Sequence, residues 1–364
     1  MQIKEVIGYL EQLAPLAYAE SFDNVGLLVG DPNTVVTEIL VTLDTLETVV
    51  DEAIEKKCNL IVSFHPIVFD GLKRFNGTNY VQRVVQKAIK NDIAIYAIHT
   101  ALDNDFKGVN DMMSEQLGLI NRKILIPQKG TVKKLITFAP SKEAAALRQA
   151  LFDVGAGAIG GYEHCSFSTE GQGTFKAKEG ANPSVGAIGV LHTEKEECIG
   201  VTFPKHLEST ILKTLFTNHS YEEVAYEIIT LENTNQHIGM GMIGELPEAI
   251  SELDFLHFLK KTFHCGCIRH SEFLNREVKK IAVLGGSGSF AIGQAKKQGA
   301  DVFITADLKY HQFYEAENTI LLADIGHYES EQFTKNLIVG YLRKKISNFA
   351  IILSDRNTNP IKYL

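Results

Sequence analysis

Near the start of the chain, hydrophobic residues alternate between short continuous runs and helical spacing. Residues 39–43, 60–63 and 93–98 are short runs rich in branched apolar side chains, which is typical of strands buried on both faces. Between these runs, residues 48–57 and 80–91 place apolar side chains at the spacing of an amphipathic helix. This alternation predicts a parallel sheet with crossover helices.

The pattern changes in the middle of the chain. Residues 134–139 resemble a strand and residues 141–154 a helix, and a second strand–helix–strand pattern covers residues 197–231, amid Gly-rich turns. We interpret this stretch as a compact inserted α+β domain.

After the insertion, the pattern of buried strands resumes. A helical segment at residues 253–263 precedes buried runs at residues 280–284, 302–305 and 319–323. We therefore predict an α/β protein in three parts: an N-terminal α/β lobe over residues 1–126, an inserted α+β domain over 127–237 and a C-terminal α/β lobe over 238–364.

Length and charge narrow the possible functions. A chain of 364 residues exceeds what one hydrophobic core usually holds and is long enough for an enzyme. Its formal net charge of -8 provides no general attraction for phosphate backbones, so nucleic-acid binding is not expected.

Two features predict the compartment. The N-terminal residues form an amphipathic pattern and no apolar run reaches membrane length, so we expect no membrane segment. The odd number of cysteines, five, argues against a disulfide framework, and we expect a cytoplasmic protein.

Candidate metal ligands follow several of the predicted strands. In parallel α/β sheets, ligands collect beyond the carboxyl ends of the strands. Imidazoles and carboxylates stand at four such places: His65; His99 and Asp103; Asp307 and His311; Asp324, His327 and Glu331.

The residues favoured as metal ligands are His65, Asp103, His327 and Glu331. Four residues separate His327 from Glu331, so a helix that begins after Gly326 would place both on one face. Imidazole with carboxylate suits zinc, iron or manganese, and Glu331 has two oxygens with which to bridge a pair of ions.

Each of these residues alone also has a structural explanation. A single histidine after a strand is often a hydrogen-bonded structural residue, Asp103 could cap a turn, and His327 with Glu331 could form a solvated pair on a helix. Their joint position at strand ends favours the metal site.

Three other kinds of motif give weaker evidence for a binding or metal site. The glycine-rich segments at residues 155–160 and 239–244 match a dinucleotide fingerprint but lack its strand-to-helix context, and we expect a close backbone turn at the second. Residues 285–289 could bind an anion through backbone amides or form a tight strand-to-helix turn. Cys265 and Cys267 lack the spacing of a zinc site, and we assign Cys265 to packing.

Several motifs in the same order resemble the NIF-three-like family, whose members are often named GTP cyclohydrolase type-two homologues. The matching segments are ESFDNVGL at 20–27, SFHPI at 63–67, HTALD at 99–103, GGSG at 285–288 and GHYESE at 326–331. The resemblance implies a dinuclear centre on His65, Asp103, His327 and Glu331 between two α/β lobes. It also implies a PII-like, ferredoxin-like insertion and a toroidal homohexamer.

One departure from the family pattern concerns the second ion. Family members usually carry a His-His pair where this chain has Phe64-His65, so the second of the two ions is expected to bind weakly. Tyr310-His311 likewise stands where a histidine pair is common, and His99 is a candidate substitute ligand.

Two functional hypotheses follow. In the first, the chain is a metal-dependent hydrolase that uses metal-activated water, with Glu331 or another carboxylate of the site helping to position that water. The family name suggests GTP as substrate. In the second, it is a non-enzymatic metal-binding or regulatory hexamer whose PII-like domain senses a small molecule. An ion with an exchangeable water would favour the first.

Overall fold

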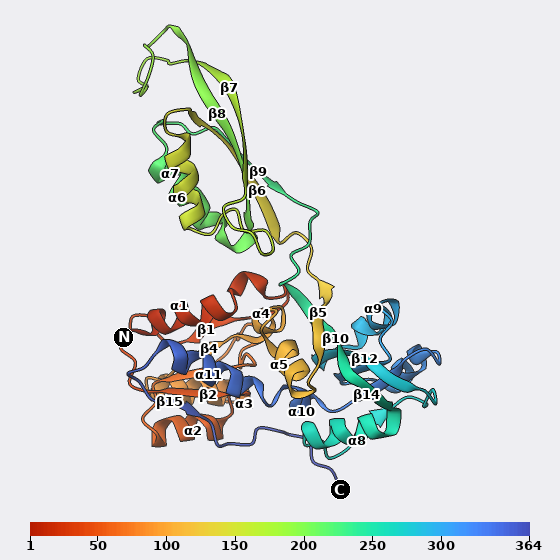
Figure 1. Cartoon of the computed structure of the whole chain (residues 1–364). Coiled ribbons are helices and arrows are strands. Elements are labelled where there is room, and N and C mark those ends of the chain that lie inside the picture. The colour runs from red at the N-terminus through yellow and green to blue at the C-terminus, as the bar shows by residue number, and fades with distance from the viewer. The chain divides into compact units, whose positions relative to one another are not determined.

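A computed structural model describes all 364 residues and divides the chain into two compact units. The first, which we call the outer unit, comprises Met1–Pro127 and Gln236–Leu364, and the inserted unit comprises Gln128–Asn235. The protein is a mixed α/β protein, as the sequence predicts, and it contains three sheets (Figure 1). No helix combines the length and the apolar stretch needed to span a bilayer.

The first sheet of the outer unit has five strands, four of them parallel. In spatial order they are β1 (Gly26–Val29), β4 (Ala94–Ala97), β3 (Leu60–Ser63), β2 (Ile39–Thr42) and β15 (Ile351–Leu353), and β1 alone runs antiparallel. Its neighbouring helices are α1 (Ile3–Leu13), α2 (Glu47–Glu55), α3 (Tyr80–Lys90) and α11 (Thr334–Lys345).

Successive residues of these strands point to opposite faces of the sheet and pack into two separate hydrophobic cores. Leu40, Ile61 and Ile95 are aligned across β2, β3 and β4 and pack with apolar residues of α2 and α3. The next aligned row, Val41 and Val62 with Tyr96, faces the larger core on the other side. Burial on both faces explains why these strands appear in the sequence as continuous apolar runs.

The second sheet of the outer unit has six strands. In spatial order they are β11 (Arg269–His270), β14 (Leu321–Asp324), β13 (Val302–Ala306), β12 (Glu277–Ser287), β10 (Gly239–Ser251) and β5 (Ile120–Pro127), of which β12, β13 and β14 are mutually parallel. Helical segments around it are α5 (Val109–Gln116), α8 (Glu252–Thr262), η3 (Ser289–Ala291), α9 (Ile292–Lys297) and η4 (Tyr310–Ala316).

The two chain segments of the outer unit exchange strands. β5, from the N-terminal segment, pairs with β10 in the second sheet, and β15, from the C-terminal segment, pairs with β2 in the first. One apolar core contains residues of both sheets, including Val62 and Val283. The two sheets therefore form a single body, although their strands come from distant parts of the sequence.

The glycine-rich segment at 239–244 lies inside β10, so the turn expected there is wrong. Gly241 has φ +68, and a Cβ on it would lie 3.0 Å from the Val283 carbonyl oxygen and 3.2 Å from the Leu125 side chain. Glycine is required because β12 and β5 approach this strand closely on either side.

The inserted unit contains one four-stranded antiparallel sheet. Its chain order is β6 (Val132–Pro140), α6 (Ala144–Asp153), β7 (Ser166–Lys176), β8 (Leu191–Pro204), η2 (Lys205–Leu207), α7 (Glu208–Asn218) and β9 (Tyr226–Thr230). The spatial order β7-β8-β6-β9 with this β-α-β-β-α-β sequence is the ferredoxin-like arrangement.

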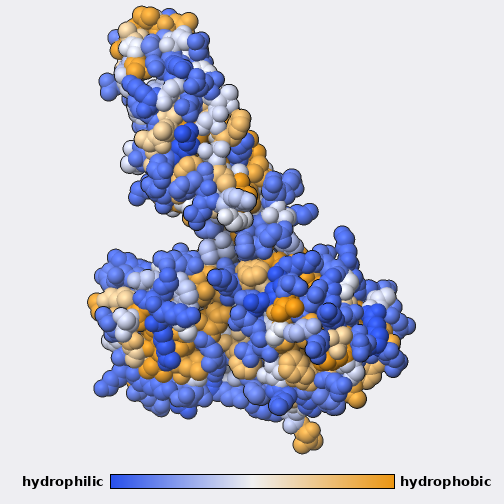
Figure 2. Space-filling view, in the orientation of Figure 1, coloured by the Kyte–Doolittle hydropathy of each residue, from blue (hydrophilic) through white to orange (hydrophobic).

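Both helices of the inserted unit cover the same face of its sheet (Figure 1). The other face carries no helix. Apolar side chains are visible at the free end of the β7–β8 hairpin (Figure 2), where Ile188, Val190 and Leu191 are exposed.

Candidate metal centre

Strand register brings the candidate residues of each sheet to one edge. In the first sheet Thr42, Ser63 and Ala97 are aligned, so the residues that follow β2, β3 and β4 leave the sheet at the same level. In the second sheet Thr305 is aligned with Asp324, and Ser287 with Ala306. The ends of parallel strands therefore gather polar side chains, as the sequence predicts.

Three of the four predicted ligands meet at one point. His65, His327 and Glu331 each place one ligand atom so that all three atoms lie within 4.8 Å of one another. The Nε2 atoms of His65 and His327 lie 3.1 Å and 3.2 Å from Oε2 of Glu331. His327 and Glu331 share one face of the short helix α10 (His327–Glu331), which begins after Gly326, as predicted from their spacing.

Glu331 is the buried member of this group. Its side chain is 4% exposed, and Oε2 has no hydrogen-bond partner even though two imidazole nitrogens approach it. A buried carboxylate oxygen without a hydrogen bond is unfavourable, and a cation shared with the two imidazoles would remove this cost.

Asp103, at the end of α4 (His99–Asp103), lies outside the three-residue group but acts on it electrostatically. Its Oδ1 atom is buried without a hydrogen-bond partner. Burial raises the pKa of the Asp103 carboxyl, and the negative charge of Glu331 raises it further. Two carboxylates that repel each other in this way favour the binding of a cation.

Each imidazole is oriented by a carboxylate on its other nitrogen. Nδ1 of His65 lies 2.8 Å from Asp44, and Nδ1 of His327 lies 2.6 Å from Asp307. The two carboxylates are themselves fixed, because Asp44 accepts a hydrogen bond from Thr358 and Asp307 accepts one from Ser287. Carboxylates in this position typically direct Nε2 toward a metal ion.

Sequence reasoning missed this supporting shell, although a signal existed. Asp44 follows β2 just as His65 follows β3, so the rule of strand ends applies to it equally. Asp307 stands after β13 in the sequence, but nothing there predicts its contact with His327. Thr358, by contrast, comes from the C-terminal tail, and no pattern in the sequence indicates its contact with Asp44.

The carboxylates around His65 and His327 favour a positive charge at the centre, either on the imidazoles or on a bound cation. Burial alone would lower the pKa of His65, but the negative charges of Glu331 and Asp44 outweigh it and raise the value to about 10. Burial also opposes the protonated form of His327, yet Asp307 and Glu331 raise its pKa to about 11. The same environment would attract a divalent ion.

The candidate substitute ligands do not join the group. His99 lies next to it, with its ring centroid 5.3 Å from that of His65, but it is not in the group whose ligand atoms lie within 4.8 Å of one another. Its Nδ1 lies 2.8 Å from Asp23, so it has the same kind of carboxylate partner as the other two imidazoles. His311 is exposed on η4 and contacts Tyr310. Phe64 is fully buried in the apolar core with its ring centroid 4.9 Å from that of His65, so it offers no ligand atom.

The glycine-rich segment at 285–289 makes space for the centre. Gly286 has φ +65, and a Cβ on it would collide with the Glu331 carboxylate and lie 3.3 Å from the His327 ring. The backbone amides of Gly285 and Gly286 donate to Asn110 and Ser330. Because both amides are already bonded, neither is free for the anion site considered from the sequence at residues 285–289.

Exposed aromatic side chains lie beside the centre. The Phe69 ring centroid is 6.4 Å from that of His99 and 6.4 Å from that of Phe22. Phe22 is 64% exposed and Phe69 47% exposed.

Cys265 is buried in the apolar core, consistent with the packing role that we assign to it.

The donor set is compatible with a divalent transition metal. Two imidazole nitrogens and a carboxylate oxygen, with a second carboxylate nearby, suit zinc, iron or manganese. The buried oxygens of Glu331 and Asp103 that lack a hydrogen bond point to the same conclusion.

Comparison with known proteins gives consistent results along the whole chain. The family profile Duf34/NIF3 (NGG1p interacting factor 3) matches residues 1–360. A Bacillus subtilis protein named GTP cyclohydrolase 1 type 2 homolog is 37% identical over 99% of this chain and 98% of its own length.

Solved structures agree with this match. A Bacillus cereus protein related to NIF3 superimposes with a TM-score of 0.86 and 37% identity, covering 100% of this chain and 99% of the other. Staphylococcus aureus protein SA1388 has a TM-score of 0.79 and 30% identity over the same shares of the two chains.

Proposed function

This chain belongs to the Duf34/NIF3 family, and from that membership and the geometry of its centre we propose that it is a divalent-metal-dependent hydrolase. The observation that carries the proposal is the meeting of His65, His327 and Glu331 within 4.8 Å, with a buried Glu331 oxygen that has no hydrogen bond. Zinc, iron or manganese is the expected ion.

Two ions per subunit are proposed. His65, His327 and Glu331 would hold the first. Glu331, which lies between the two imidazoles, would bridge to a second ion, and Asp103 would be a ligand as well. The buried Phe64 removes one expected imidazole, so the second ion should bind more weakly than the first.

When bound, the metal would act as a Lewis acid and lower the pKa of a coordinated water toward neutrality, which makes that water a nucleophile. The chain's own residues supply the positioning. Asp44 and Asp307 fix the two imidazoles, and we assign to Glu331 the additional role of orienting the attacking water.

The substrate should carry a ring system. Phe22 and Phe69 present exposed aromatic surface beside His99, where a planar ring could stack. GTP, which the relatives' name includes, is therefore the first substrate to test.

Two assembly features remain proposals. The ferredoxin-like inserted unit is proposed to be PII-like, and the subunits to form a toroidal homohexamer. Mass photometry at nanomolar to micromolar concentration should then show a particle of six chains of 40.3 kDa each. A monomer or dimer over that whole range would refute the hexamer.

The activity is tested with metal-loaded protein and a panel that contains GTP, other nucleotides and phosphoesters, with products followed by chromatography. We expect conversion of at least one compound by the wild type and none by His327→Ala. Stoichiometric bound metal without any turnover would contradict the hydrolase and support the alternative, a non-enzymatic metal-binding or regulatory assembly.

A further inference from the structure

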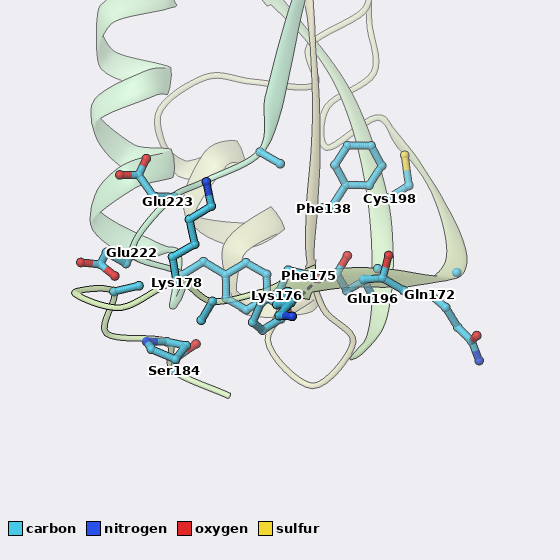
Figure 3. Close-up of a pocket in the computed structure, with 18 of the residues that line it drawn as sticks. Phe138, Gln172, Phe175, Lys176, Lys178, Ser184, Glu196, Cys198, Glu222 and Glu223 are labelled. Atoms are coloured by element: carbon cyan, nitrogen blue, oxygen red, sulfur yellow. Dashed lines mark hydrogen bonds between the residues drawn. The ribbon is translucent and has the colours of Figure 1, made fainter. Parts of the chain in front are cut away.

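The inserted unit contains a cavity of about 850 Å³ that none of the metal-site residues lines. Its walls include Phe138 of β6, Phe175 of β7, and Glu196 and Cys198 of β8 (Figure 3). Tyr221 of the α7–β9 connection also lines it. Phe138 is paired with Cys198 in the sheet, whereas their neighbours Thr137 and Ile199 are buried on the other face. The cavity therefore lies on the sheet face that carries no helix.

Two glycines of β7 create part of this space. Gly171 and Gly173 lie two residues apart in the strand and both line the cavity. A Cβ on Gly171 would meet nothing within 4 Å, whereas one on Gly173 would collide with the Glu196 carboxylate. Glycine weakens a strand interior and often marks a place where a ligand approaches closely.

Glu196 is a buried carboxylate with no counter-ion. It is 9% exposed and accepts a hydrogen bond of 2.6 Å from the Tyr221 hydroxyl, but no Lys, Arg or His side chain forms an ion pair with it. Its neighbours differ in this respect, because Glu194 pairs with His192 and Glu197 with Arg148. Burial and the nearby Glu196 raise the pKa of the Tyr221 hydroxyl, so the phenol stays neutral. It therefore supplies no positive charge to balance the Glu196 carboxylate.

The remaining walls suit an apolar body. The rings of Phe175 and Tyr221 lie 6.1 Å apart, and Phe138 adds a third aromatic side chain. Lys176 and Lys178 also line the cavity, but both are exposed, and the exposed Glu222 and Glu223 accompany them. An apolar cavity with one buried, unpaired carboxylate is the kind of site that binds an organic cation.

We propose that this cavity binds a small organic cation, with its protonated nitrogen on Glu196 and its aromatic or alkyl body against Phe138, Phe175 and Tyr221. The ligand class is a primary or substituted ammonium compound of about the size of an aryl-alkyl amine. The proposal is independent of the hydrolase activity, because the site lies wholly within the inserted unit.

The test uses the full chain and three probes of nearly equal shape: 2-phenylethylammonium, the neutral 2-phenylethanol and the anionic 3-phenylpropionate. Binding is measured by saturation-transfer NMR and by calorimetric titration. We expect the wild type to bind the ammonium about tenfold or more tighter than the alcohol, and the carboxylate not at all.

Three variants locate the binding. Glu196→Gln keeps the acceptor for Tyr221 but removes the charge, so the ammonium should bind no better than the alcohol. Gly171→Leu should fill the cavity and abolish binding of both, while its open surroundings allow the strand to fold. Glu197→Gln is the matched control and should bind like the wild type.

Circular dichroism and thermal unfolding establish that each variant is folded. The proposal is overturned if the wild type binds none of the probes or binds all three equally. Undiminished ammonium binding by a folded Gly171→Leu, or an equal loss in Glu196→Gln and Glu197→Gln, would also overturn it.

Discussion

His65 and His327 come from opposite ends of the sequence and approach the same oxygen of Glu331. Each is held by its own carboxylate, so the two Nε2 atoms are oriented before any ion binds. This preorganisation leaves little conformational entropy to be lost on metal binding.

Removing a ligand should therefore reduce metal binding strongly. We expect His65→Ala, Asp103→Ala and His327→Ala each to lower metal content, and Glu331→Ala to have the largest effect because it would contact both ions. Metal is quantified by inductively coupled plasma mass spectrometry. The exposed His311→Ala and the core variant Cys265→Ser are the controls, and wild-type metal content in all four ligand variants would refute the assignment.

The two orienting carboxylates should have smaller effects. Asp44→Asn and Asp307→Asn keep a side chain of the same size but weaken the hold on His65 and His327. We expect metal affinity to fall by roughly 10- to 100-fold in each. Competition titration with a chromophoric chelator measures this loss, and an unchanged affinity in both variants would show that the imidazoles need no such support.

Gly286 provides a test of the space at the centre. Gly286→Ala should disturb Glu331 and destabilise the fold by about 1–3 kcal/mol, because its φ is +65 and its Cβ would collide with the carboxylate. Gly293→Ala, in α9 with no atom near the added Cβ, should instead be neutral or stabilising by up to about 1 kcal/mol. Denaturant unfolding compares the two; equal effects would mean that the centre does not restrict position 286.

At the scale of elements, the sequence predicted the buried strands well and their partners less well. β2, β3, β4, β13 and β14 appear as apolar runs because both faces are buried. β5 and β15 are peripheral strands, and nothing local indicates that each crosses to the other sheet. Their pairing depends on contacts between residues more than 100 positions apart for β5 and more than 300 positions apart for β15.

The attachment of the C-terminal segment provides a stability prediction. Glu52 of α2 is buried and accepts hydrogen bonds from Ser354, from the backbone N–H of Asp355 and from Lys56. Burial acts to raise the pKa of Glu52, but these hydrogen bonds outweigh it and hold the pKa below its ordinary value of 4.5. The charged form is therefore favoured by the native state.

Glu52→Gln should lower the free energy of unfolding by about 1–3 kcal/mol at neutral pH. Because the native pKa is depressed, the stabilisation is complete above pH 4.5 and is lost as the pH falls through the lower native value. Urea unfolding from pH 7 to pH 3 should show the two proteins converge in acid. A difference that grows toward low pH would contradict this account.

At the scale of the whole molecule, the centre exists because two sheets share one core. His65 follows a strand of the first sheet, His327 follows a strand of the second, and the core residues Val62 and Val283 pack in the same cluster. The sequence indicated the candidate ligands through the ends of the strands, but the contact between the sheets depends on long-range packing. For the same reason, the cavity of the inserted unit could not be foreseen from its glycines alone.

The most direct test of the metal centre is a crystal structure of the metal-loaded protein with diffraction data collected at the zinc, iron and manganese absorption edges. The account predicts an anomalous peak within bonding distance of Nε2 of His65, Nε2 of His327 and Oε2 of Glu331. Anomalous peaks found only at other residues, or none in protein with stoichiometric metal, would contradict it.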